Sequence, residues 1–261
     1  MTSPGIPGSL PPLEWQPVHT PWYDQARPDI ALTVATSSIA TISGPAGTGK
    51  TTTVVACAQE EDLDLRYTAL AHGAGVKDII VGMHEALHGP RRGSQRDSRT
   101  LRRDIVETLA AGGRGIIADE VHYSGIGGML TLAQIWERVK NANGRGFPLF
   151  LVGATVQAAI SRNDELVSRV EFPIRIDVLS TDDIIKAVQA ISARCAATPV
   201  KRLLAFDNII GRGNLRAWSH FIRASERDER LKGQPISAEE TRAFVSKRRA
   251  TPANKRLAQA S

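Results

Sequence analysis

The chain has 261 residues, of which 42% are hydrophobic and 23% charged, the balance of a globular protein of one or two domains. No apolar run is long enough to span a membrane, and the first residues lack the pattern of a secretory signal peptide. The two cysteines, Cys57 and Cys195, have no metal-ligand spacing and suggest no disulfide framework. These features exclude an integral membrane protein and a disulfide-stabilised secreted domain, and they favour a cytoplasmic protein.

The chain is basic, with a formal net charge of +6 and an isoelectric point of about 9.6. A protein that binds a polyanion such as DNA would have such a balance. A basic surface that is simply solvated is the alternative.

Residues 1–29 contain many Pro and Gly residues, interleaved with Trp15, Trp22 and Tyr23, and show neither helical nor strand periodicity. We expect an extended Pro-rich arm here, either disordered or docked by its aromatic residues. A helix from about residue 29 to residue 36 is expected to lead into the first strand.

The run from Gly44 to Thr51, GPAGTGKT, fits the phosphate-binding loop of P-loop nucleotidases. It lies between an apolar strand-like segment, 39–43, and a helix-like segment, 52–59, which is the context that the motif requires. Glycines let backbone N–H groups converge on an anion, and the helix N-terminus adds its dipole. Lys50 can reach the β- and γ-phosphates of ATP, and the Thr51 hydroxyl can ligate Mg²⁺. The expected nucleotide-binding residues in this run are Gly44, Pro45, Ala46, Gly47, Thr48, Gly49, Lys50, Thr51 and Thr52.

A strand over 65–69 and a helix over 76–87 are followed by a basic loop, 88–99, and a second helix, 100–111. Arginines gather in this loop and at the start of the second helix. The region is either a solvated loop or a surface that contacts the phosphate backbone of DNA. Its arginines are Arg91, Arg92, Arg96, Arg99, Arg102 and Arg103.

The segment Gly115-Ile-Ile-Ala-Asp119-Glu120 is a short apolar strand that ends in two carboxylates. Downstream of a phosphate-binding loop, Asp119 is expected to hold the Mg²⁺ shell together with Thr51, largely through water. Glu120 can orient or deprotonate the attacking water. The order of loop, about seventy residues, and then strand-Asp-Glu indicates an ATPase with an additional strand in its sheet rather than a small kinase.

A helix over 129–140 and a buried strand over 147–152 come next. A polar residue just after that strand can touch the γ-phosphate or the lytic water, and Thr155 is our candidate. The alternative for Thr155 is a turn or helix-cap threonine.

The C-terminal part of the chain carries helix caps. Ser180, Asn214 and Ser237 each precede a helical pattern, and from Lys247 the chain is basic. We therefore expect an all-helical region that ends in a basic tail. The expected boundaries are 1–29 for the arm, 30–178 for an α/β domain, 179–226 for a helical lid, and 227–261 for a last helix with the tail.

Taken together, these motifs resemble those of the AAA+ ATPases over roughly residues 30–225. Within that class the chain is similar to the short DNA-transposition ATPases of the MuB, TniB and TnsC type, with secretion ATPases of the ExeA kind as close relatives. Residues 44–51 look like Walker A, 116–120 like Walker B, and the strand before Thr155 like the sensor-1 strand. The resemblance implies an α/β fold: a P-loop AAA+ core, whose parallel sheet is sandwiched by helices, and a small C-terminal all-helical lid.

The resemblance also implies a second subunit at the site. The segment Ser168-Arg169-Val-Glu-Phe172 is similar to the clamp-loader Ser-Arg-Cys box, with Val170 in place of the cysteine. By that similarity, Arg169 would reach the nucleotide of a neighbouring subunit and assist catalysis. Arg162 and Arg175 are alternatives for this trans arginine, and a surface salt bridge is the alternative role for each.

Gly213-Asn-Leu-Arg216 resembles sensor 2, which implies that Arg216 contacts the γ-phosphate in its own subunit. With Lys50 and Glu120, the implied activity is the hydrolysis of ATP to ADP and phosphate with Mg²⁺. The resemblance implies that turnover is slow and is stimulated by DNA or a partner.

The resemblance implies a regulator of DNA transposition, bacterial or phage-encoded, in the host cytoplasm and with no membrane association. ATP would assemble copies of the chain into a ring or helical filament on double-stranded DNA. The assembly would recruit a transposase or integrase, and hydrolysis would dismantle it. Two other classes stay open: a protein-remodelling or ExeA-like secretion ATPase, and a clamp-loader or initiator-type helper. The short arm cannot replace the N-terminal DNA-binding domain of MuB, so DNA contacts are expected from the ATPase core, the region 91–103 or the tail.

Overall fold

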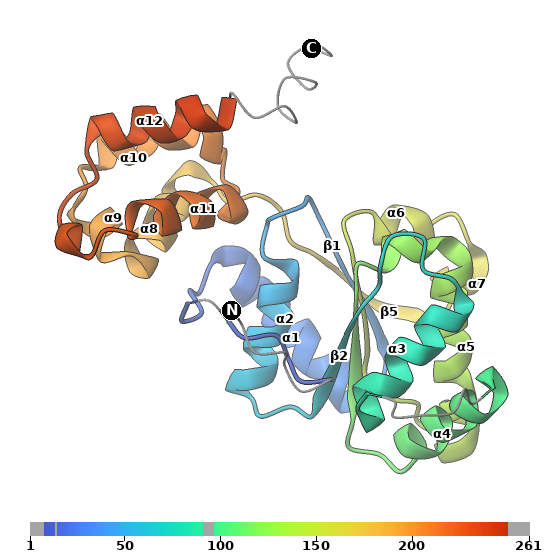
Figure 1. The fold of residues 1–261 in the computed structure, drawn as a ribbon. Coiled ribbons are helices and arrows are strands. Elements are labelled where there is room, and N and C mark those ends of the chain that lie inside the picture. The colour runs from blue at the N-terminus through green and yellow to red at the C-terminus, as the bar shows by residue number, and fades with distance from the viewer. Residues whose placement is uncertain (1–7, 14, 91–96, 250–261) are drawn as a thin grey trace. The chain divides into compact units, whose positions relative to one another are not determined.

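The structure, a computed structural model, describes residues 8–13, 15–90 and 97–249. These residues form two compact units, which are both drawn in Figure 1. An α/β unit comprises most of the chain up to Ile176, and a helical unit comprises most of the rest. Two short stretches, 18–21 and 47–49, group with the helical unit. Within the described residues, no helix has the length and apolar character needed to cross a membrane.

The α/β unit is built on one sheet of five parallel strands. The strands are β1 (Ile39–Ser43), β2 (Leu65–Ala69), β3 (Gly115–Asp119), β4 (Leu149–Val152) and β5 (Val170–Arg175). Their order is β2-β3-β4-β1-β5, and every pairing is parallel. Because β4 lies between β1 and β3, an additional strand separates the strand before the phosphate-binding loop from the strand that ends in Asp119. The expected α/β fold is confirmed.

Helices cover both faces of this sheet. They are α1 (Pro21–Thr36), α2 (Lys50–Glu60), α3 (Val76–His88), α4 (Ser98–Ala110), the 3₁₀ helix η1 (Val121–Ser124), α5 (Gly125–Asn143), α6 (Val156–Ile160) and α7 (Asp164–Val167). Figure 1 shows α1 and α2 on one face, with α3, α4 and α5 on the other. Successive strand residues alternate between the two layers, so Ile117 and Phe150 pack with α1 and α2, whereas Ile116 and Leu149 pack with the opposite layer. Burial on both faces explains why these strands are continuous apolar runs.

The N-terminal arm is shorter than the sequence predicted, because α1 begins at Pro21 rather than near Asp29. A proline fits the first helical position, where its missing N–H would have no partner in any case. Tyr23 is buried and donates its hydroxyl to the Glu60 carboxylate at the end of α2. Pro28 lies inside the helix. Because an internal proline usually ends a helix, it concealed the helical segment in the sequence.

The described part of the helical unit is made of helices and their connections. They are α8 (Thr181–Ile191), α9 (Ala193–Ala197), α10 (Val200–Phe206), the π-helix η2 (Asp207–Gly211), α11 (Leu215–Ser225), the 3₁₀ helix η3 (Glu229–Leu231) and α12 (Ala238–Arg249). The first helix is divided at Ser192, whose side chain accepts a hydrogen bond from the Cys195 N–H and so caps α9. In the core, the rings of Phe206 and Phe221 stack with centroids 4.0 Å apart, and Trp218 meets Phe206 edge-on at 4.6 Å.

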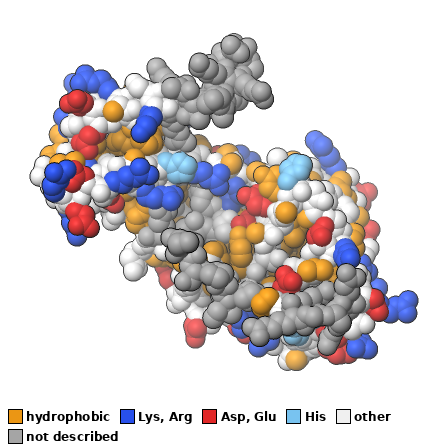
Figure 2. Space-filling view, in the orientation of Figure 1, with side chains coloured by type: hydrophobic (Ala, Val, Ile, Leu, Met, Phe, Trp, Pro, Cys, Tyr) orange, Lys and Arg blue, Asp and Glu red, His pale blue; other side chains and the backbone are white. Residues whose placement is uncertain are grey.

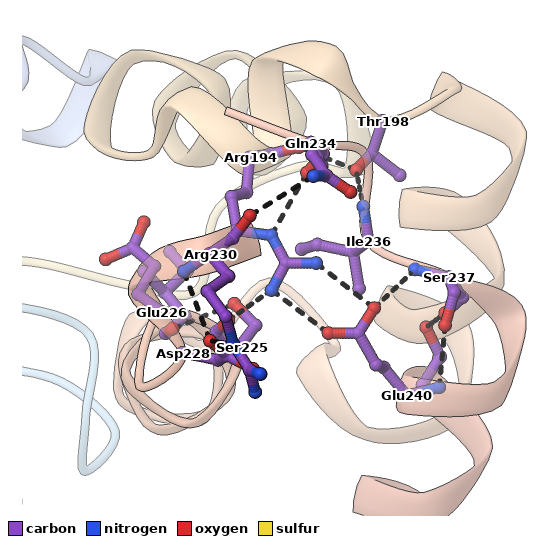
Figure 3. A network of polar contacts seen from close by, with 12 residues as sticks. Arg194, Thr198, Ser225, Glu226, Asp228, Arg230, Gln234, Ile236, Ser237 and Glu240 are labelled. Carbon is purple, nitrogen blue, oxygen red and sulfur yellow. Dashed lines mark hydrogen bonds and ion pairs between the residues drawn. The ribbon is translucent and has the colours of Figure 1, made fainter. Parts of the chain in front are cut away.

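A buried arginine ties the last helix to the rest of the helical unit, as Figure 3 shows. Arg194 is 2% exposed and donates to the carbonyl oxygens of Ser225 and Gln234. It also pairs with the Glu240 carboxylate of α12, with N–O distances of 3.0 and 3.1 Å. Glu240 in turn accepts from the Ser237 N–H at 2.8 Å, which caps α12. One guanidinium thus links α9, the end of α11 and the start of α12.

Candidate functional site

The phosphate-binding loop joins β1 to α2 and requires glycine at its first position. Gly44 has a φ of 140°, and a Cβ there would lie 1.8 Å from the carbonyl oxygen of Ile176. Gly47 and Gly49 also have positive φ, at 82° and 95°. Larger residues are disfavoured in these conformations. A loop of this kind keeps its backbone N–H groups accessible to an anion at the helix N-terminus.

Lys50 and Thr51 occupy the first turn of α2. Lys50 is 8% exposed, and its Nζ donates to the carbonyl oxygens of Gly44 at 2.9 Å and Pro45 at 2.8 Å. Its ammonium is therefore held against the loop that precedes it. A buried cation needs anionic or dipolar partners, and nucleotide phosphates are such partners.

Asp119, at the end of β3, meets this first turn. Its Oδ2 accepts hydrogen bonds from the Thr51 hydroxyl at 2.7 Å and the Tyr67 hydroxyl at 2.9 Å. Its Oδ1 accepts from the Glu120 N–H at 2.8 Å. The structure thus brings together Thr51 and Asp119, which the sequence predicted as partners. Hydroxyl and carboxylate oxygens are the ligands that Mg²⁺ prefers, so these residues fit the implied ion.

Tyr67, in β2, is a contributor that the sequence analysis missed. Burial raises the pKa of its hydroxyl well above the usual range, and the neighbouring Asp119 carboxylate raises it further. The hydroxyl therefore stays protonated and donates to Asp119. The contact arises because β2 pairs with β3, with Ala69 opposite Asp119. A single sequence gives no signal for that pairing.

Glu120 turns the chain out of β3. Its backbone is in the left-handed region, with φ 56° and ψ 32°, which is uncommon for a residue other than glycine. Its side chain is 40% exposed, and Oε2 lies 3.3 Å from Nδ1 of His122. A Cβ on Gly153 would lie 2.9 Å from the same Nδ1, so the end of β4 packs closely on this histidine. Nothing in the sequence spacing of His122 distinguishes it as a residue of the site.

Thr155 follows β4 by three residues, at the same edge of the sheet as Asp119. It is exposed and precedes α6 as its N-cap residue, but its side chain makes no capping hydrogen bond. The helix-cap alternative therefore describes the position of Thr155 but not an interaction of its hydroxyl. Its role at the γ-phosphate stays a prediction.

Arg169 is anchored within its own chain. Its guanidinium pairs with Glu137 of α5 at 2.8 Å and with Glu165 of α7 at 3.2 Å, and the side chain is 21% exposed. Arg162 and Arg175, the alternatives for a trans arginine, are both exposed. The salt-bridge alternative thus holds for Arg169 in the isolated chain, and a trans role would require it to leave these partners.

Arg216 is the second residue of α11 and is exposed. The Asn214 side chain caps this helix by accepting from the N–H groups of Arg216 and Ala217, at 3.1 and 3.2 Å. The preceding turn is fixed by Asp207, which is 3% exposed and whose Oδ1 accepts from the Gly213 N–H at 3.0 Å. These contacts define the backbone that carries Arg216. Its contact with a γ-phosphate stays a prediction.

The candidate DNA surface is described only in part. Arg91, Arg92 and Arg96 lie outside the described residues, whereas Arg99, Arg102 and Arg103 lie in α4. Asp97 caps α4 by accepting from the N–H of residue 100 at 2.8 Å. Arg103 lies 3.6 Å from carboxylate oxygens of both Asp104 and Glu107. Acidic neighbours therefore offset part of the positive charge in α4.

Comparison with known proteins gives one family match and several similar folds. Residues 34–159 match the family model described as AAA domain. No curated protein matches the chain in sequence. Among solved structures, the chain is similar to Cdc6p from Pyrobaculum aerophilum, with a TM-score of 0.72 and 16% identity over 90% of this chain and 69% of that one.

Two Aeropyrum pernix structures are also similar. The ORC2 protein in its ADP form gives a TM-score of 0.68 and 16% identity, over 89% of this chain and 70% of that one. The ORC1 protein in complex with DNA gives a TM-score of 0.68 and 15% identity, over 88% of this chain and 66% of that one. At these identities the likeness shows the fold. Residues 34–159 thus resemble an AAA domain in sequence, and the chain shares the α/β fold of these structures, as the sequence predicted.

Proposed function

We propose that the protein is a Mg²⁺-dependent ATPase that uses ATP binding and hydrolysis as a switch. The observation that carries this proposal is the meeting of Lys50, Thr51 and Asp119 at the carboxyl edge of the sheet, with Glu120 next in the chain. Bound Mg²⁺ would neutralise charge on the phosphates, and Thr51 and Asp119 would hold its shell. The ADP form of the similar ORC2 structure is in keeping with a nucleotide site.

The chain's own residues divide the work of hydrolysis. Lys50 and the N–H groups of the loop bind the phosphates. The Glu120 carboxylate accepts a proton from the attacking water, and Thr155 orients that water or the γ-phosphate. Arg216 stabilises the negative charge that spreads over the γ-phosphoryl oxygens, and Arg169 does so from a neighbouring copy. Glu120→Gln should lower turnover by about 10²- to 10⁴-fold while ATP binding persists. Unchanged turnover would rule out this role for Glu120.

We propose that ATP joins copies of the chain into a ring or filament. Arg169, Arg162 and Arg175 are the candidates for the arginine that crosses to the neighbour. Arg169 must first break its pairs with Glu137 and Glu165, so ATP-driven assembly and loss of these pairs should coincide. Sedimentation with ATP distinguishes the candidates, because only the alanine variant of the true trans arginine should bind ATP and yet stay a monomer, and its turnover should fall as well.

We further propose that the assembly forms on double-stranded DNA and regulates DNA transposition by recruiting a transposase. The support is the basic sequence, the resemblance of its motifs to those of transposition ATPases, and the similarity to a structure solved with DNA. An initiator-type role is the second candidate, favoured by the likeness to Cdc6p and ORC1 over about nine-tenths of this chain.

Electron micrographs and filter binding with duplex DNA test these proposals together. With ATP or a non-hydrolysable analogue we expect assemblies on duplexes of any sequence, and with ADP we expect them to disperse. Binding that requires one duplex sequence would favour the initiator role. Binding that is independent of nucleotide would contradict the switch, and turnover stimulated only by protein partners would favour a remodelling or secretion ATPase.

A further inference from the structure

Basic residues are unevenly distributed along the chain. Residues 177–261 contain 16 Lys and Arg against 9 Asp and Glu, whereas residues 1–176 contain 17 against 18. The net positive charge therefore lies entirely in the C-terminal third, which includes the helical unit. Long-range attraction of a polyanion is strongest toward the part of a protein that carries the net charge.

Within the helical unit, α11 gathers basic residues on one face. Arg227, two residues beyond the end of α11, is exposed. Within α11, Arg216, His220 and Arg223 are exposed and follow one another at intervals of four and three residues. At 3.6 residues per turn these positions fall within an arc of about 60°. The residues on the opposite side are Trp218, Phe221, Ile222 and Ser225, all of them buried. The basic face is thus the face that α11 turns away from the core of its unit.

Acidic residues beside this face have partners elsewhere. Glu226, at the end of α11, accepts a hydrogen bond from the Ser192 hydroxyl at 2.5 Å. Asp228 pairs with Arg230 at 2.7 Å. Figure 2 shows Lys and Arg side chains beside a histidine over the part of the helical unit where Figure 1 draws α11. Arg230 therefore offsets the charge of Asp228, whereas Glu226 keeps its negative charge at the end of α11.

We propose that His220 and Arg223 of this face, together with Arg227 just after the helix, contact the phosphate backbone of double-stranded DNA, while Arg216 is kept for ATP. The proposal rests on the proposed function in taking DNA as the polyanion. His220 and Arg223 lie about 4.5 Å apart along the helix axis, and phosphates of one strand follow one another every ~3.4 Å along the duplex axis. These two side chains can therefore meet neighbouring phosphates, and Arg223 and Arg227 can each bind one through two N–H groups. Contacts of this kind carry no sequence preference.

The salt dependence of DNA binding counts such contacts and so tests the face. Arg223→Gln/Arg227→Gln leaves Arg216, the candidate ATP contact, in place. Each lost phosphate contact lowers the slope of log affinity against log salt by about 0.9, so we expect the slope to fall by about 2. Arg223→Lys/Arg227→Lys keeps both charges and should keep the slope near that of the unsubstituted chain.

Two further double variants each remove two positive charges, as the α11 glutamine pair does. Arg138→Gln/Arg145→Gln removes two exposed arginines of the α/β unit and should leave the slope unchanged. Arg99→Gln/Arg103→Gln tests α4 in the same way. If the α11 glutamine pair retains the full slope while the unsubstituted chain binds DNA, this inference is overturned and the proposed function survives. If the unsubstituted chain shows no ATP-dependent DNA binding, both are overturned.

Discussion

The two units position their candidate functional residues by different means. In the α/β unit, Lys50, Asp119 and Thr155 each come shortly after, or at, the carboxyl end of a parallel strand, and β1, β4 and β3 are neighbours in the sheet. In the helical unit, Arg216 follows a turn that is fixed by Asp207 and Asn214. The order of the strands thus positions the site in the α/β unit, whereas local polar contacts position Arg216 in the helical unit.

This difference determines how well the positions of functional residues in each unit can be predicted from the sequence. Parallel strands end at one edge of a sheet, so a short apolar run followed by a polar residue is enough to place that residue near the site. A turn held by a buried carboxylate has no comparable periodic signature. Asp207 must accept from the N–H of Gly213 and from the indole of Trp218, six and eleven residues further along. The helical unit should therefore be the part whose stability depends on individual polar side chains.

The largest effect is expected at the strand-positioned site. Lys50→Ala should lower ATP turnover by about 10³-fold, because one buried charged donor to the phosphates is lost. Steady-state kinetics and binding of a fluorescent ATP analogue measure this loss. Lys140→Ala is the matched control, since Lys140 is an exposed lysine of the same unit with its Nζ 5.0 Å from the Trp136 ring. Equal turnover in the two variants would remove Lys50 from the site.

In the helical unit, the largest effect is expected on stability. Arg194→Ala should lower the free energy of unfolding by about 3 kcal/mol, since Glu240 and two carbonyl groups lose a buried partner. Arg230→Ala is the control, because Arg230 pairs with Asp228 at the surface and should change little. Urea titration followed by fluorescence, in a background whose sole tryptophan is Trp218, reports on this unit. Similar midpoints for both variants would show that α12 does not depend on the Arg194 network.

Most of the fold could be predicted because its signals are local. β1, β2 and β3 have the bounds that the apolar runs indicated, and the parallel sheet with helices on both faces is confirmed. Among the expected boundaries that were wrong, two helix starts have a clear physical reason. Pro28 concealed the first eight residues of α1, and the glycines at 125, 127 and 128 concealed the start of α5, which begins four residues earlier than its apolar stripe.

The site was predictable where one residue's neighbours in sequence are also its partners. The phosphate-binding loop and the Asp-Glu pair are of that kind. Tyr67 and the ion pairs of Arg169 are not, because they depend on which strands and helices adjoin. The roles of Thr155 and Arg216 stay predictions, since both residues are exposed and their proposed contacts are with a ligand.

A smaller effect should follow from removing the partner that the sheet order brings to Asp119. Tyr67→Phe deletes the hydroxyl that donates to Oδ2 and keeps the ring that packs in the core. Loss of a residue that orients a metal ligand lowers metal affinity by about 10-fold, so the Mg²⁺ concentration for half-maximal turnover should rise by that factor. Titration of turnover with Mg²⁺ at saturating ATP measures it. An unchanged Mg²⁺ requirement would mean that Thr51 and the Glu120 N–H orient Asp119 without help from Tyr67.

The smallest expected effect is a pH dependence that belongs to the helical unit. Burial alone would raise the pKa of Glu240, but the hydrogen bonds from Arg194 and from the Ser237 N–H outweigh it and hold that pKa below its usual value of 4.5. A carboxylate with a lowered pKa in the folded state stabilises the fold above its unfolded pKa. That stabilisation is lost as pH falls through the folded pKa. The urea concentration at the unfolding midpoint of this unit should therefore decrease as the pH is lowered below about 4.5. Glu240→Gln should make this decrease smaller. Glu239→Gln, at the exposed neighbouring residue, is the control and should leave the pH profile unchanged. If this variant reduced the pH dependence as much as Glu240→Gln does, the effect would come from the net charge of the unit rather than from the Arg194 network.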